Sequence, residues 1–458
     1  MAIATVNPAT GETMKRFDEI TDEELDARLE RASMTFSKYR LTSFEQRSGW
    51  MLRAAQLLDS EQEAVARTLT TEMGKTVKSA RAEAAKCSRG FRYYAEHAQE
   101  LLADEPADAA AVGAGTAYAR YQPLGPVLAI MPWNFPLWQV VRFAAPSLMA
   151  GNVGLLKHAS NVPQTALYLG ELFERAGFPA GGFQALLMGS ARVERVIRDK
   201  RVAAVTLTGS GPAGAAVGAL AGEMIKPSIL ELGGSDPFIV MPSADIEAAA
   251  RVATTARCQN NGQSCIAAKR FIVHKTVAEE FEKRFVGHMS ALKVGDPLDE
   301  ATDVGPLATS SGRDDVEELV ADALSKGAKV LCGGKRLPRP GWFYPPTVLT
   351  GLTPQMRVYS EEAFGPVAGL YRVGDIEEAI TLANGTEFGL GANAWTNDAY
   401  ERARFIDELE SGAVFINGMV TSYPELPFGG VKTSGYGREL AAPGIRAFCN
   451  LKTVWLGA

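Results

Sequence analysis

The chain has 458 residues, of which 46% are hydrophobic and 22% are charged, and its formal net charge is -6. This length is too great for one ordinary core and predicts two or three domains, while the composition is typical of globular proteins. The mild acidity, without any block of Lys or Arg, argues against nucleic acid and anionic membranes as partners. We therefore expect small molecules or other proteins as partners.

The start of the chain, MAIATVNPATGE, lacks a basic segment followed by an apolar one, so we expect no secretory signal and a cytoplasmic location. The cysteines are few and scattered, and they lack the spacing of metal ligands, so we expect free thiols and no metal site. They are Cys87, Cys258, Cys265, Cys332 and Cys449.

The first hundred residues have the polar and apolar periodicity of amphipathic helices. Residues 104–125 are rich in Ala, Gly and Pro and then alternate, which predicts a loop that leads into an exposed β-ribbon. A domain boundary is expected near this segment.

Residues 126–156 carry a single charge, Arg142, and resemble a membrane span in hydrophobicity. Four prolines interrupt this stretch, and its Asn and Gln side chains would lack partners in lipid. We predict a buried strand, a tight turn, a helix and a second strand instead.

Helical and strand-like patterns alternate from there to the end of the chain. Such repeated pairs predict an α/β fold with doubly wound parallel sheets. The final KTVWL is expected to form an edge strand that pairs with another subunit.

Cys265, in QNNGQSCIAAKR, is the candidate nucleophile. A thiol that attacks a carbonyl needs a base and donors for the oxyanion, and none of the four histidines is an obvious base. A helix over residues 245–259 is expected to end before Cys265, and its dipole would oppose a thiolate. Taken alone, Cys265 is better explained as an inert buried thiol.

Three more polar residues lie at strand ends or in the apolar stretch. Glu231 in LELGG is a possible base or a solvated strand-end carboxylate, and Asn134 in PWNFP is a possible oxyanion donor or an ordinary turn residue. Arg142 needs an anionic partner, which is either an internal carboxylate or an anionic substrate. The segment TLTGSGPAG, between a strand and a helix, fits a phosphate-binding turn or a simple helix cap.

The motifs PWNFP, KHAS, LTGSGPAG, LELGG, NNGQSC, EEAFGPV and LPFGGVKTSGYGRE, in this order, resemble the aldehyde dehydrogenase superfamily, whose members use NAD(P). With NPATGE near the start, the resemblance spans essentially the whole chain. It implies two doubly wound domains and a small β element that joins subunits into a homodimer or homotetramer. The implied division is a cofactor domain of residues 1–110 and 127–231, a catalytic domain of 232–422, a ribbon of 111–126 and 443–458, and a return segment of 423–442.

The resemblance also implies a role for individual residues. Cys265 matches the nucleophile, Glu231 the general base that activates the deacylating water, and Asn134 the side-chain donor to the oxyanion. The residues that match cofactor contacts are Trp133, Lys157, Ser160, Gly209, Ser210, Glu362 and Phe364. Thiolate attack followed by hydride loss and hydrolysis of a thioester is the implied reaction, and we expect Glu231 and the oxidised nicotinamide to lower the pKa of Cys265.

Many family members that prefer NAD have a glutamate where this chain has Ser160. A hydroxyl there, with Lys157 nearby, predicts that NADP is preferred and that NAD is also accepted.

The expected substrate contacts are Arg142, Trp138, Ser264 and Ser422. If residues 136–143 are helical, Asn134 and Arg142 face the same way, because eight residues are just over two turns. Arg142 and Ser422 resemble residues that bind the carboxylate in succinate-semialdehyde dehydrogenases, so we expect oxidation of succinate semialdehyde. Gln259 replaces a second arginine found in many of those enzymes, which leaves glutarate semialdehyde, another ω-carboxy aldehyde or a nonpolar aldehyde open.

Overall fold

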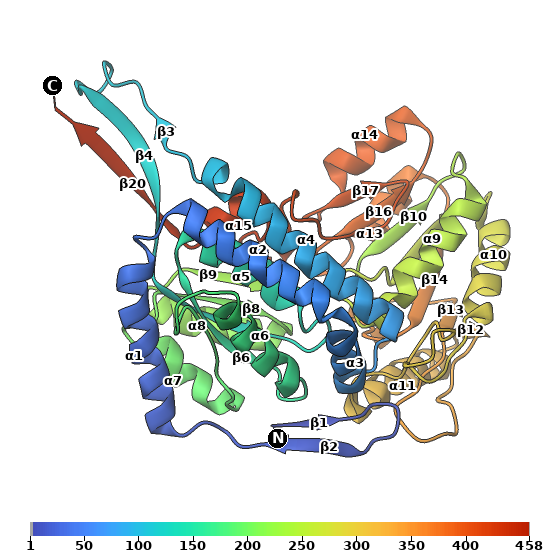
Figure 1. The fold of residues 1–458 in the computed structure, drawn as a ribbon. Coiled ribbons are helices and arrows are strands. Elements are labelled where there is room, and N and C mark those ends of the chain that lie inside the picture. Colours follow the sequence, from blue (N-terminus) through green and yellow to red (C-terminus); the bar gives the residue numbers. More distant parts are fainter. Residues whose placement is uncertain (1–2, 458) are drawn as a thin grey trace.

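Two mainly parallel β-sheets, a layer of N-terminal helices and a projecting β-ribbon make up the fold of the computed structural model, which describes residues 3–457 (Figure 1). The chain begins with an antiparallel hairpin formed by β1 (Ile3–Val6) and β2 (Thr13–Phe17). Four helices follow: α1 (Asp22–Tyr39), α2 (Phe44–Ser60), α3 (Gln62–Met73) and α4 (Val77–Leu101).

The first sheet has six strands in the order β19-β9-β8-β5-β6-β7. Their bounds are β5 (Pro126–Met131), β6 (Val153–His158), β7 (Phe183–Ala185), β8 (Ala204–Thr208), β9 (Ser228–Glu231) and the antiparallel β19 (Gly435–Tyr436). The chain runs outward from β5 through β6 to β7 and then returns to β8 on the other side of β5. The strand order therefore reverses between β5 and β8, and ligands bind at such a point in open α/β sheets.

The helices of this part are α5 (Trp138–Ala150), α6 (Pro163–Arg175), α7 (Val193–Arg198), α8 (Gly211–Glu223) and α15 (Ala441–Arg446), with a 3-10 turn η1 (Ser190–Arg192). All thirteen residues of α5 are buried. This helix packs on β5 and β6, α4 packs on α5, and α2 packs on α4 (Figure 1). The stretch 126–156 is thus a buried β5-α5-β6 unit, as its prolines and amides predicted.

The second sheet has seven strands in the order β12-β13-β14-β11-β10-β16-β17. They are β10 (Pro237–Val240), β11 (Arg270–His274), β12 (Lys329–Cys332), β13 (Thr347–Thr350), β14 (Val367–Val373), β16 (Ala392–Trp395) and β17 (Val414–Ile416). Its helices are α9 (Ile246–Cys258), the 3-10 turn η2 (Gln259–Gly262), α10 (Ala278–Ala291), α11 (Ser310–Ser325), α12 (Arg357–Ser360), α13 (Ile376–Asn384) and α14 (Ala399–Glu408). Two short strands, β15 (Phe388–Gly389) and β18 (Val431–Lys432), form a separate antiparallel pair. In the chain β15 precedes β16, and β18 follows β17.

Local sequence signals fix where the helices begin. Thr21 and Glu24 form a capping box at α1, and Ser43 and Gln46 form one at α2, so two orphan amides are satisfied at each start. Thr76 caps α4 through its hydroxyl. These caps explain why the helix pattern of the first hundred residues could be read from the sequence.

The projecting ribbon is formed by β20 (Cys449–Leu456), β4 (Thr116–Pro123) and the short β3 (Glu105–Pro106), in that order (Figure 1). The C-terminal segment is an edge strand, as expected: β20 pairs antiparallel with β4 over its whole length, from Cys449↔Pro123 to Leu456↔Thr116. Within residues 3–457 no strand pairs with its other edge, and the pairing of that edge with another subunit stays a prediction.

The predicted α/β class with two doubly wound parallel sheets is confirmed, and β12 and β19 are its antiparallel edge strands. In the described part of the chain no helix combines the length and the apolar character that crossing a membrane requires.

Candidate active site

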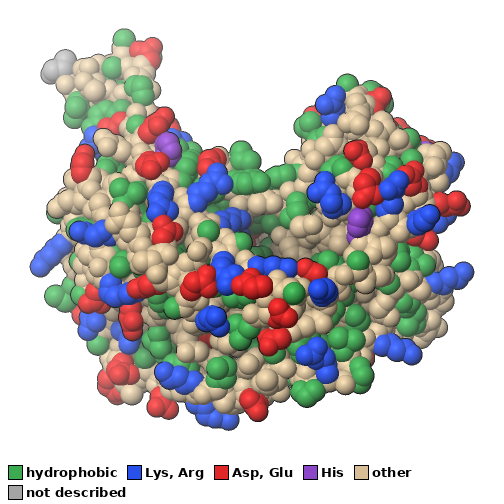
Figure 2. All heavy atoms as spheres, turned by 45° about the vertical axis from the view of Figure 1, so that its right-hand side comes forward, with side chains coloured by type: hydrophobic (Ala, Val, Ile, Leu, Met, Phe, Trp, Pro, Cys, Tyr) green, Lys and Arg blue, Asp and Glu red, His purple; other side chains and the backbone are tan. Residues whose placement is uncertain are grey.

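A cavity of about 560 Å³ lies beside Cys265. Side chains of α4, of α5, of the loop that carries Cys265 and of the segment 421–428 line it. On the molecular surface, Figure 2 shows a hollow between the ribbon side and the opposite lobe, with hydrophobic and basic side chains at its floor. Cys265 is partly exposed, so its thiol is accessible from the cavity.

Two consecutive asparagines turn the chain between α9 and Cys265. Asn260 and Asn261 have φ angles of 53° and 58°, a left-handed conformation that Asn adopts more readily than most residues. Gly262 follows with φ 79°, and a Cβ there would lie 2.4 Å from a backbone carbon of Gly365. The helix therefore ends well before the cysteine, and the unfavourable dipole effect, which fades within the last turn, is weaker at Cys265 than the sequence suggested.

Lys269 holds the backbone of this loop. Its buried ammonium donates hydrogen bonds to the carbonyl oxygens of Ser264 (3.0 Å) and Cys265 (2.7 Å), and it lies 3.2 Å from a carboxylate oxygen of Glu362. This places a fixed positive charge next to the thiol.

Burial raises the pKa of the Cys265 thiol to about 12, although the charges of Arg142 and Lys269 act in the opposite direction. The thiol is therefore protonated at neutral pH in this structure. Desolvation, first, and the neighbouring charge of Glu439, second, raise the pKa of Glu231 well above its usual range. A carboxylate of raised pKa is a stronger proton acceptor, which suits a general base.

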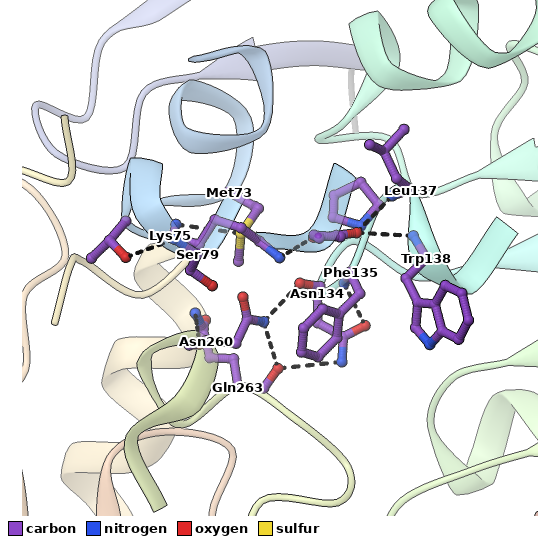
Figure 3. Close-up of polar contacts among 12 residues, drawn as sticks. Met73, Lys75, Ser79, Asn134, Phe135, Leu137, Trp138, Asn260 and Gln263 are labelled. Carbon is purple, nitrogen blue, oxygen red and sulfur yellow. Dashed lines mark hydrogen bonds and ion pairs between the residues drawn. The ribbon is translucent and has the colours of Figure 1, made fainter. Parts of the chain in front are cut away.

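Asn134 contacts Asn260 and Gln263, in the segment that leads to Cys265, and is held in place by several hydrogen bonds (Figure 3). Its Nδ2 donates to the carbonyl of Gln263 (3.3 Å), and its own carbonyl accepts from Asn260 Nδ2 (2.7 Å). Its Oδ1 accepts from the Phe135 amide (3.1 Å), which is the self-bonded turn that the sequence left open. One N–H of Nδ2 remains to donate to another oxygen.

Asn134 does not lie on the helix of Arg142. Helix α5 begins only at Trp138, so the expectation that helical spacing aligns Asn134 with Arg142 is wrong. Residues 133–137 form the bend and the turn that precede this helix. A buried ion pair fixes this turn instead: Glu83 accepts from the amides of Leu137 and Trp138, both at 2.9 Å, and binds Lys75.

Arg142 has an internal carboxylate partner. It forms an ion pair with Glu439, and both side chains are almost fully buried, with 2% and 4% of their surface exposed. Its guanidinium also donates to Thr208 Oγ1 (3.4 Å) and lies 4.5 Å from the centre of the Phe428 ring. Of the two partners that the sequence allowed, the structure shows the carboxylate. The charge of Glu439 also raises the pKa of Glu231, and that of Arg142 lowers it.

The residues that resemble cofactor contacts meet at the carboxyl ends of the first sheet. Trp133 follows β5, Lys157 ends β6, and Gly209 and Ser210 follow β8, around the point where the strand order reverses. Ser210 is the N-cap of α8 but its side chain makes no capping bond, so the amides at this helix start are available to a phosphate.

Lys157 fits the same cofactor. Its side chain is 8% exposed, burial lowers its pKa, and no acceptor within residues 3–457 hydrogen-bonds to its ammonium. A largely buried lysine whose ammonium has no acceptor in the protein can bind an external oxygen, such as a ribose hydroxyl or a phosphate. Ser160, three residues on, is anchored by the Ala4 amide, which donates to its carbonyl (3.1 Å).

At the other end of the crevice, Glu362 and Phe364 extend from the second sheet toward the first. Glu362 accepts from the Gly234 amide (3.2 Å), and Phe364 packs edge-to-face on Trp133 with ring centres 5.7 Å apart. The residues present therefore fit an NAD(P) dinucleotide, which Lys157 and Glu362 would help to hold.

Among the expected substrate contacts, Trp138 and Ser422 lie together, although 284 residues separate them. Trp138 Nε1 donates to Ser422 Oγ (2.8 Å), and Lys86 Nζ donates to the same oxygen (2.9 Å). Ser264 and Gln259 also line the cavity, and Ser264 Oγ and Gln259 Nε2 are buried without a hydrogen-bond partner.

Sequence reasoning missed several residues of this site, namely Lys75, Glu83, Lys86, Asn260, Lys269 and Glu439. Each is a polar residue on a helix face or in a loop, where a solvent-exposed position is the common case. A signal existed for Glu83 and Lys86, because residues 79, 83 and 86 recur at helical spacing on one face of α4 and all line the cavity. The other four depend on contacts with distant segments.

The model of the aldehyde dehydrogenase family matches residues 1–454. The chain is 66% identical over 459 residues to a succinate-semialdehyde dehydrogenase [NADP(+)] of Mycobacterium avium (strain 104), which covers all of this chain and 97% of the relative. It is 64% identical over 456 residues to succinate-semialdehyde dehydrogenase [NADP(+)] 1 of Mycobacterium tuberculosis (strain ATCC 25618 / H37Rv), with full coverage of both.

Solved structures agree with this family. The structure of succinic semialdehyde dehydrogenase from Streptococcus pyogenes, in complex with NADP+, has a TM-score of 0.97 and 38% identity, with all of both chains covered. That of succinate-semialdehyde dehydrogenase from Burkholderia pseudomallei has a TM-score of 0.96 and 34% identity, with 100% of this chain and 95% of that chain covered. The match to the family model and the identity to these relatives show that the chain belongs to the aldehyde dehydrogenase family.

Proposed function

We propose that this protein oxidises succinate semialdehyde to succinate, with NADP as the preferred acceptor and NAD as an alternative. The observation that carries the proposal is the identity of 64–66%, along the entire chain, to enzymes named for this substrate and this cofactor. The cavity supports it, because hydroxyl, amide and ammonium groups that can donate to a carboxylate line it.

The first step is attack by Cys265 Sγ on the aldehyde carbon. The carbonyl oxygen becomes an oxyanion, and the remaining N–H of Asn134 Nδ2 and the Cys265 amide donate to it. Asn134 can serve because Asn260 and Gln263 hold its backbone and its side chain. The product of this step is a tetrahedral thiohemiacetal on Cys265.

The bound dinucleotide supplies the acceptor for the hydride that leaves the substrate carbon. A thioester on Cys265 then remains, and Glu231 takes a proton from the water that hydrolyses it. The pKa of Glu231, raised by burial and by the charge of Glu439, favours this proton transfer. Succinate then leaves, Cys265 is regenerated as the thiolate of the enzyme, and Glu231 passes the proton it accepted to solvent.

Activation of the thiol is the demanding step, because its pKa lies near 12 in this structure. Lys269 supplies one fixed charge beside it, and Glu231 is the acceptor for its proton. We infer that the positive charge of the oxidised nicotinamide contributes the remainder.

A panel of aldehydes tests the proposal. Formation of NADPH or NADH is followed by absorbance with succinate semialdehyde, glutarate semialdehyde and hexanal, and Cys265→Ser is the inactive control. We expect the highest kcat/KM with succinate semialdehyde and NADP. A higher kcat/KM with hexanal would refute the substrate, and a higher value with NAD would refute the cofactor preference.

The subunit arrangement is also a proposal. We infer that the ribbon, residues 111–126 and 443–458, joins copies of this chain into a homodimer or homotetramer, while 1–110 with 127–231 bind the cofactor and 232–422 catalyse. The open edge of β20 carries exposed apolar side chains, since Leu451, Trp455 and Leu456 are 50–54% exposed. Light scattering on the wild type and on Trp455→Lys measures the assembly, and a monomeric wild type would contradict it.

A further inference from the structure

We propose that Lys86 of α4 is the cation that binds the distal carboxylate of the substrate, together with the hydroxyl of Ser422. The inference rests on the proposed function and deepens it, because it assigns the charge that selects an ω-carboxy aldehyde to a residue outside the expected set.

Charge pairing around the cavity singles out Lys86. Five charged side chains line the cavity: Lys78, Glu83, Lys86, Arg142 and Asp303. Lys78 is paired with Asp303 at 2.8 Å, Glu83 with Lys75, and Arg142 with Glu439. Within residues 3–457, no carboxylate lies within 4.0 Å of the Lys86 ammonium. Lys86 is therefore the cavity cation whose charge is left for a ligand.

The contacts of Lys86 hold its ammonium in one place. Its Nζ donates to Ser422 Oγ (2.9 Å) and lies 4.4 Å from the centre of the Trp138 ring. Trp138 Nε1 donates to the same Ser422 oxygen. Trp138 and Ser422 are 3% and 4% exposed, so the ammonium is fixed against a dry wall of the cavity.

The remaining hydrogen-bonding capacity of this group matches a carboxylate. Ser422 Oγ already accepts from two donors, so its own O–H must donate elsewhere. Lys86 has three N–H donors and uses one of them on Ser422. The pair therefore offers only donors, and a carboxylate offers only acceptors, with two oxygens to receive them.

Arg142 contributes less than the sequence suggested. Glu439 offsets its charge, and Thr208 and Phe428 occupy further parts of the guanidinium. A substrate carboxylate near Arg142 would meet a nearly neutral pair that already has an anion. This also explains how Gln259 can replace a second arginine, because a different element, α4, supplies the cation.

The environment of Lys86 agrees with a ligand-binding cation. Desolvation, first, and the charge of Arg142, second, lower its pKa to about 8. The other charged or titratable groups that face it are Glu83, Cys87 and Arg89 of α4 itself. A substrate carboxylate beside the ammonium would raise the pKa of Lys86 again and so stabilise its charged form.

Substrate discrimination tests the proposal most directly. Succinate semialdehyde and butanal have the same number of carbons, and only the first ends in a carboxylate. We expect Lys86→Met to lower kcat/KM for succinate semialdehyde by about 10- to 100-fold, mainly through KM, because a hydrogen bond to a charged group is lost. The value for butanal should stay within about threefold, on the scale of a lost apolar contact.

Two further variants complete the comparison. Lys86→Arg keeps the charge and should retain most of the preference for the carboxylate. Lys78→Met is the matched control, since Lys78 lies on the same helix and lines the same cavity, but its charge is taken by Asp303. It should leave the ratio of the two efficiencies unchanged.

Binding of succinate gives a readout that does not need turnover. Succinate should raise the thermal unfolding midpoint of the wild type and of Lys78→Met, but not that of Lys86→Met. An unchanged ratio of efficiencies, an equal loss on both aldehydes, or the same stabilisation by succinate in Lys86→Met would each overturn the role of Lys86. A wild type that prefers butanal would instead refute the proposed function, and the succinate measurement would still decide whether Lys86 binds a carboxylate.

Discussion

Removing the charge of Glu83 should destabilise the protein and slow its chemistry together. Lys75 and Glu83 are 0% and 2% exposed, and the carboxylate also accepts from the amides of Leu137 and Trp138 at the start of α5. Glu83→Gln keeps an oxygen for those amides but leaves the Lys75 ammonium without an anion. Losing one partner of a buried ion pair costs about 3–5 kcal/mol.

Urea unfolding followed by tryptophan fluorescence measures this cost in the wild type, in Glu83→Gln, in Lys75→Met and in the double variant. We expect the double variant to be more stable than either single variant, because no unpaired charge remains in it. A substitution of Glu280, which forms an exposed ion pair with Arg284, is the control. It should change the free energy of unfolding little.

The same pair should matter for turnover. Glu83 and Lys75 hold the loop of Asn134, since the Lys75 ammonium also lies 4.3 Å from the centre of the Phe135 ring (Figure 3). A displaced loop weakens the donor to the oxyanion, so kcat should fall more than KM rises. A Glu83→Gln variant within about 1 kcal/mol of the wild type, or a double variant with additive losses, would refute the coupling.

Three other predictions follow from the charges of the site. The pKa of Lys86 is lowered to about 8, so its charge is present below that pH and is lost above it. The ratio of kcat/KM for succinate semialdehyde to that for butanal should therefore fall about tenfold per pH unit above pH 8. A ratio that does not change with pH would contradict this. Glu439→Gln removes a charge that raises the pKa of Glu231. The acidic limb of the pH profile for thioester hydrolysis, measured by single-turnover kinetics, should therefore move to lower pH. An unmoved limb would show that Glu439 does not influence Glu231. Ser160→Glu should shift the preference from NADP toward NAD, because a carboxylate repels the 2'-phosphate, and equal ratios of the two efficiencies before and after would disprove that account.

Much of the site was predictable because its chemistry is carried by residues in short, recognisable segments. Cys265, Asn134 and Glu231 each stand in a turn or at a strand end whose glycines and prolines set the backbone, and the β5-α5-β6 unit follows from apolar runs broken by proline. The dinucleotide crevice follows as well, because parallel strands bring their carboxyl ends to one edge.

The sequence did not predict which charged side chain of the cavity lacks an ion-pair partner. Arg142 was the only charge in its stretch, and nothing near it in the chain indicates that Glu439 is its partner. Lys86 looked like one more polar residue of an amphipathic helix, while Ser422, its partner, is 336 residues away.

The sequence by itself determined the fold class, because periodicity and local backbone preferences encode strands, turns and helices. The nucleophile and the cofactor contacts were predicted from the ordered motifs that resemble the family. Only the tertiary structure decided which cation faces the substrate. Electrostatic partners are chosen by distance through space, and that distance is set when α4, α5 and the segments of Ser422 and Glu439 pack around one cavity. Packing neutralises Arg142 and leaves Lys86 its charge.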